Sequence, residues 1–197
     1  MENVAPALIA FTSALLVGFG SHFVAEDYRR FRDSQAIAAA LAGELNSIKL
    51  SLPELRRVLP EMRDLLDKLM PIPLPEMPDQ SSPIFEANVE RIGLLGGDLA
   101  GRVAFIYDQI STFRTSFQLL SKHHTTMDLS WSSLLVGRCL HLVESNELKV
   151  ITLIENLQQH SEIGYVRSRL VGMAVITGIT LLSLSSLFGA IFCARPS

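Results

Sequence analysis

The sequence has few of the residues that mark a disulfide-bonded protein. Only two cysteines, Cys139 and Cys193, occur among its 197 residues. Cys139 falls in an expected helix of the middle segment, whereas Cys193 ends a long apolar run near the C-terminus. Because a disulfide requires two Cα atoms within about 7 Å of each other, this separation argues against a bridge within the chain. We therefore expect no disulfide framework.

Charge of neither sign dominates the sequence. The chain has 17 Lys and Arg against 20 Asp and Glu, for a net charge of −3. Recognition of nucleic-acid phosphates needs clustered basic residues, and here they are scattered or lie beside apolar runs. Nucleic acid is therefore not an expected partner.

The usual catalytic and cofactor motifs are also missing. The glycine-rich segment 93–102 lacks the Gly-Lys-Ser/Thr ending of a phosphate-binding loop, and no serine stands in Gly-x-Ser-x-Gly. Cys139 and His141 are two positions apart on an expected helix, so their side chains point to different faces. We expect no enzymatic activity, no catalytic residue and no cofactor.

One cluster of possible metal ligands remains on the same expected helix. His141, Glu144 and Glu147 recur every three residues. Di-metal helical bundles use two Glu-x-x-His motifs and two further carboxylates, whereas this sequence has the reverse order once. The cluster is better interpreted as a solvated polar face, and no metal site is predicted.

Two long uncharged runs dominate what the sequence does contain. They cover residues 4–25 and 170–194, and the second is 25 residues long. Because about 20 apolar residues in a helix cross a bilayer core of roughly 30 Å, both runs are predicted to be transmembrane helices. The predicted segments are transmembrane helix 4–25, amphipathic helical segment 26–70, proline-rich connector 71–83, helical bundle 84–169 and transmembrane helix 170–194.

Basic residues beside these runs predict an orientation. Arg29, Arg30 and Arg32 follow the first run, and Arg167 and Arg169 precede the second. Positive residues collect on the cytoplasmic side of a membrane. The pattern predicts a multi-pass protein of a bacterial cytoplasmic (inner) membrane, with both termini outside and the middle domain in the cytoplasm.

Small residues recur at fourfold spacing in both apolar runs, which is typical of faces where membrane helices approach closely. Glycine and alanine are common in membrane helices in any case, so this packing role is a hypothesis. The candidate packing residues are Ala14, Gly18, Ala174, Gly178, Ser185 and Gly189.

An apolar stripe with alternating spacings of three and four residues follows the first run. Such spacing is typical of a helix that packs on another helix, within its own core or in a coiled coil between chains. Ser51 and Glu54 fit a capping box, so one helix is expected to end near Leu50 and another to start near Pro53, with a kink at Pro60. The stripe is our candidate interaction surface: Leu45, Ile48, Leu52, Leu55, Leu59, Met62 and Leu66.

Five prolines between residues 71 and 83 are too dense for a helix and predict an extended spacer or docking strip. Helix is expected again after Pro83, and Gly96 and Gly97 should end it. A second stripe from Leu99 to Leu120 and a last helix from about Thr125 complete the pattern. The expected fold class is all-α: two transmembrane helices flanking a cytoplasmic helical bundle.

These features predict a function by assembly and not by catalysis. The first hypothesis is a two-pass integral membrane protein whose cytoplasmic domain is an interaction or assembly module. Its expected partners are the lipid bilayer and either further copies of itself or a helical protein. The alternative is an oligomerising membrane effector, or a pore gated by the cytoplasmic domain. A membrane-tethered enzyme is a third possibility, with His141 and Glu144 as its best candidates.

Overall fold

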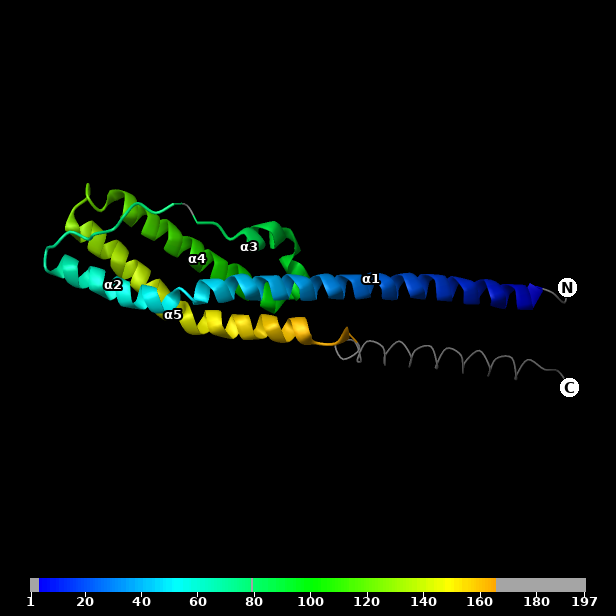
Figure 1. Ribbon diagram of the computed structural model, residues 1–197. Helices are drawn as coiled ribbons and strands as arrows, with labels where there is room; N and C mark the ends of the chain where they lie inside the picture. The colour runs from blue at the N-terminus through cyan, green and yellow to red at the C-terminus, as the bar shows by residue number, and fades with distance from the viewer. Residues whose placement is uncertain (1–3, 79, 166–197) are drawn as a thin grey trace. The chain divides into compact units, whose positions relative to one another are not determined.

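The computed structural model describes residues 4–78 and 80–165, with the backbone alone for residues 4–21. Every regular element in this part of the chain is helical, so the predicted all-α class is confirmed for the described residues (Figure 1). The chain divides into the units Met1–Ser161 and Glu162–Ser197, and the helices belong to the first unit apart from the last residue of α5. The elements are α1 Val4–Lys49, α2 Leu52–Asp67, α3 Pro83–Asn88, the 3₁₀ helix η1 Val89–Leu95, α4 Gly97–His123 and α5 Leu129–Glu162.

The first apolar run is not a separate helix. Residues 4–25 form the start of α1, which continues for 46 residues in all. Six of the eight residues from 26 to 33 are charged, so the helix passes from the apolar run straight into a polar stretch. In the part of the chain that the structure describes, no helix has both the length and the apolar character needed to span a bilayer.

This finding corrects the membrane predictions. The predicted two-pass topology, inner-membrane location and membrane effector or pore alternative are therefore wrong. Ala14 and Gly18 lie in α1, where the side chains are outside the description, and Ala174, Gly178, Ser185 and Gly189 lie outside the described residues together with the rest of the run 170–194.

The break between α1 and α2 is where the sequence predicts it. α1 ends at Lys49 and α2 begins at Leu52, with Pro53 in its first turn and Pro60 inside it. The predicted capping box is wrong, because the Ser51 side chain makes no cap hydrogen bond. Instead, the Ser51 carbonyl accepts the Leu55 backbone N–H at 3.1 Å.

α4 and α5 are antiparallel neighbours joined by a short turn. Asp128 ends that turn and caps α5: one of its carboxylate oxygens accepts the Trp131 backbone N–H and the Ser130 hydroxyl, each at 2.7 Å. These hydrogen bonds, led by the one from Ser130, hold the pKa of Asp128 below its usual value. The cap satisfies a backbone donor that the first helical turn leaves free.

Two hydrophobic cores lie along the α4–α5 pair. The first joins α1 and η1 to the start of α4 and the end of α5, through residues such as Leu41, Leu45, Val103, Ile106, Leu153 and Leu157. The second joins α2 and the connector residue Ile72 to the end of α4 and the start of α5, through Leu59, Met62, Leu66, Leu120, Val136 and Cys139. α4 and α5 therefore carry both cores.

The predicted interaction stripe belongs to these cores. Leu45 and Leu59 are fully buried, and Met62 and Leu66 nearly so. Ile48 packs partly buried against the first core, and Leu52 and Leu55 against the second. The stripe therefore faces the chain's own helices and offers little surface to a partner.

Candidate functional site

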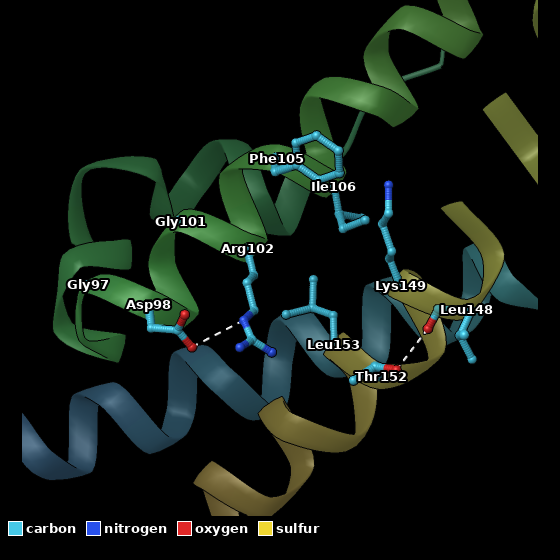
Figure 2. A pocket seen from close by; sticks show the side chains of 10 residues that line it. All are labelled: Gly97, Asp98, Gly101, Arg102, Phe105, Ile106, Leu148, Lys149, Thr152 and Leu153. Carbon is cyan, nitrogen blue, oxygen red and sulfur yellow. Dashed lines mark hydrogen bonds and ion pairs between the residues drawn. The ribbon is translucent and has the colours of Figure 1, made fainter. Parts of the chain in front are cut away.

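A groove with a volume of about 620 Å³ lies between α4 and α5 (Figure 2). Its floor consists of Ile106 and Leu153, which belong to the first core. Two large apolar side chains on its walls are exposed to solvent: Phe105 by 45% and Leu148 by 74%. An apolar floor with exposed apolar walls is typical of a surface that receives another side chain or helix.

Two glycines leave part of one wall of this groove without side chains. Gly97 and Gly101 are one helical turn apart at the start of α4 and both are exposed. A Cβ placed on either residue meets nothing within 4 Å, so the chain's own packing does not require glycine at these positions. A glycine inside a helix costs about 1 kcal/mol relative to alanine. Gly101 thus leaves an open notch in the groove, although glycine at this position makes α4 less stable than alanine would.

Charged groups of both signs line the same groove. Arg102 pairs with Asp98 at 3.1 Å, one turn earlier on α4. The Lys149 ammonium lies 5.0 Å from the centre of the Phe105 ring and donates a hydrogen bond to the Asn146 side-chain oxygen at 3.2 Å. The groove therefore combines a notch, two apolar projections, two cations and one carboxylate.

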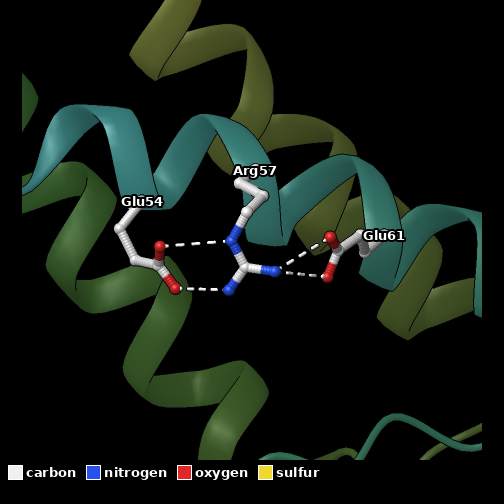
Figure 3. Close-up of polar contacts among 3 residues, drawn as sticks. All are labelled: Glu54, Arg57 and Glu61. Atoms are coloured by element: carbon white, nitrogen blue, oxygen red, sulfur yellow. Dashed lines mark hydrogen bonds and ion pairs between the residues drawn. The ribbon is translucent and has the colours of Figure 1, made fainter.

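The ion pairs of α2 form a different kind of feature (Figure 3). Arg57 donates to Glu54 at 2.6 Å and to Glu61 at 3.0 Å, and these bonds raise the pKa of the arginine, with Glu54 contributing most. All three side chains are well exposed, so solvent and salt screen their interaction. They stabilise a helix surface and leave no cavity for a ligand.

A serine–histidine contact that no local sequence pattern predicts lies near the end of α5. The Ser34 hydroxyl is 2.7 Å from Nε2 of His160 and donates to the Leu94 carbonyl at 2.9 Å. Because the hydroxyl has a single proton, it accepts from His160, which is the reverse of the arrangement in a nucleophile–base pair. The contact joins α1, η1 and α5.

The structure also places the other residues considered for chemistry. His141 and Glu144 are exposed on α5, and Glu147 is paired with Arg56 of α2 at 2.9 Å. Burial raises the pKa of the Cys139 thiol to about 12, which leaves it protonated and unreactive at neutral pH. Among the described residues, no three potential metal ligands lie together.

Sequence patterns do not reveal the groove, because its lining residues come from two separate segments, 97–106 and 148–153. Leu148 stands outside the periodic apolar stripes, and the sequence pattern predicts only that Gly97 ends a helix. The fourfold spacing of Gly97 and Gly101 was the one local signal. This spacing points to a groove only when α5 is known to lie beside the start of α4.

Comparisons with known proteins do not indicate a function for this chain. No protein-family model matches the chain, and no curated protein or solved structure is similar to it. The groove between α4 and α5 is consequently the starting point for a functional proposal.

Proposed function

We propose that this protein is a self-assembling helical module that pairs with a second copy of itself through the α4–α5 groove. The observation that carries the proposal is that one face holds both a projection and a notch. Leu148 projects into solvent on α5, and Gly97 and Gly101 leave open space on α4. A two-fold dimer needs a surface that is complementary to itself, and this face meets that requirement.

In the proposed dimer, Leu148 of each copy inserts beside Gly101 of the other. The exposed leucine and phenylalanine side chains then lose contact with water, which is the main favourable term in association. The glycines permit the two helices to approach closely, because they have no side chain at the contact.

Charges at the groove support the same pairing. Asp98 and Lys149 line it from different helices. A two-fold rotation brings the α4 side of one copy toward the α5 side of the other, so opposite charges can meet across the interface. Complementary charge contributes to the specificity and register of such contacts. The proposal assigns the protein a structural role without catalysis.

The experiment is sedimentation equilibrium of the full chain and two groove variants. Leu148→Asp places a charge in the contact, and Gly101→Leu fills the notch. Each is expected to weaken self-association at least tenfold. Gly101→Leu should also raise the stability of the monomer, because leucine favours a helix over glycine by roughly 0.8 kcal/mol and a Cβ at this position has no other atom within 4 Å.

Leu134→Asp provides the matched control. Leu134 is also on α5 and is 71% exposed, but it does not line the groove. This variant should associate like the original chain. A monomeric original chain, or equal association by all the variants, contradicts the proposal.

A further inference from the structure

A second cavity lies on a different side of α4, facing the connector and the start of α3. Its volume is about 600 Å³, within the range of roughly 300 to 1,000 Å³ typical of small-molecule sites. α2 contributes Leu55 to it, and the connector contributes Met77 and Ser82. It shares no lining residue with the α4–α5 groove.

Four aromatic side chains line this cavity. Phe85 of α3 and Tyr107 of α4 are stacked with their ring centres 4.0 Å apart. Phe113 and Phe117, one turn apart on α4, form a second stacked pair at 5.7 Å. Aromatic faces favour flat apolar ligands that stack on them.

Arg114 stands on α4 within the same cavity and is unusual among the arginines of the chain. In the part that the structure describes, it is half-buried while every other arginine is exposed. Its Nη1 donates to the buried Ser82 hydroxyl at 2.7 Å, and no carboxylate of the described residues lies within ion-pair distance. A half-buried guanidinium with a neutral partner retains donors for an anion.

Two carboxylates on the elements around Arg114 accept hydrogen bonds from other donors. Glu86 also lines the cavity, and its carboxylate accepts the Ser82 backbone N–H at 3.0 Å. Glu44 of α1 accepts the Tyr107 hydroxyl at 2.6 Å and two backbone N–H groups at the start of α3. Both acids are therefore held by donors other than Arg114.

We propose that this cavity binds a small aromatic carboxylic acid. Arg114 donates hydrogen bonds to the carboxylate of the ligand, and the aromatic side chains stack on its ring. The planar guanidinium matches a carboxylate with two parallel hydrogen bonds. The inference is independent of the proposed self-assembly, because the two sites lie on different surfaces of α4.

The test uses isothermal titration calorimetry of the full chain with 2-naphthoate and with its neutral analogue 2-naphthamide. The expected result is saturable binding of one naphthoate per chain, with the amide at least tenfold weaker. Arg114→Gln should weaken naphthoate binding at least tenfold and change amide binding little, and Arg114→Lys should recover part of the loss. Circular dichroism confirms that each variant is folded.

Arg138→Gln is the matched control, because it removes the same charge from an exposed position on α5. It should bind naphthoate like the original chain, and so should the groove variant Leu148→Asp. The proposal is overturned if naphthoate shows no saturable binding, if the amide binds equally well, or if a folded Arg114→Gln variant binds as tightly as the original chain. Failure of this test leaves the sedimentation result unaffected.

Discussion

His160 illustrates how one residue can join three elements. Its ring nitrogen donates to the Ser34 hydroxyl, which in turn donates to the Leu94 carbonyl. Burial against these elements lowers the pKa of His160. The sequence does not identify this residue, because its partner Ser34 is 126 positions away and no local pattern connects the two.

The lowered pKa of His160 predicts a pH-dependent stability. Since the unfolded chain, with a histidine pKa of about 6.5, binds the proton more readily, the free energy of unfolding should fall as the pH drops below about 6.5. The loss should be complete once the pH is below the pKa of the folded state. Urea unfolding between about pH 8 and pH 5 measures this, and His160→Gln should make the dependence shallower.

His141→Gln is the control, because it removes an exposed histidine from the same helix. An equally steep pH dependence in the original chain and the His160→Gln variant would show that His160 has no such role.

At the scale of elements, the sequence predicts helix boundaries well wherever proline and glycine restrict the backbone. Pro53 follows the break after Lys49, and Gly96 has a φ of 86°, which suits glycine and disfavours other residues, at the start of α4. α3 begins at Pro83, where the sequence predicts that helix resumes, but no sequence pattern predicts its contact with α1. This six-residue helix depends on Glu44 of α1, which is some 40 residues away.

Glu44 therefore predicts a stability effect that is larger than that of an ordinary surface acid. It accepts the N–H groups of Ile84 and Phe85 and the Tyr107 hydroxyl. Hydrogen bonds to a charged group contribute about 1.5 to 3 kcal/mol each. Because water partly replaces the hydrogen bonds that are lost, Glu44→Ala should lower the free energy of unfolding by about 2 to 3 kcal/mol.

Urea denaturation measures this loss, with the exposed Glu90→Ala on η1 as the control. Tyr107→Phe should be less harmful in the Glu44→Ala background than alone, because the two side chains share a hydrogen bond. Additive effects of the two substitutions would mean that Glu44 does not act through Tyr107.

At the scale of the whole molecule, sequence periodicity identified the residues of the core but not the helices that share them. The stripe from Leu45 to Leu66 is divided between two cores, and the long helices α4 and α5 connect those cores. Hydropathy alone also predicts a membrane span at residues 4–25, whereas these residues begin the 46-residue helix α1 and no described helix qualifies as a span. The pairing of α4 with α5, and thus the groove, depends on long-range packing.

The proposed dimer makes a specific prediction about which residues meet across the interface. Gly101 of one copy should lie beside Leu148 of the other, and neither should meet its own counterpart. Cysteines at these two positions, one on each chain, should therefore form a disulfide across the interface. The native Cys139 is buried and should not compete.

The most direct measurement is disulfide formation in an equimolar mixture of Gly101→Cys and Leu148→Cys chains, each with Cys193→Ser and a distinguishable tag. The account predicts a mixed-tag disulfide dimer in good yield, and little dimer from either variant alone. Leu134→Cys in place of Leu148→Cys should not cross-link to Gly101→Cys. A mixture that yields no more mixed-tag dimer than this control would contradict assembly through the α4–α5 groove.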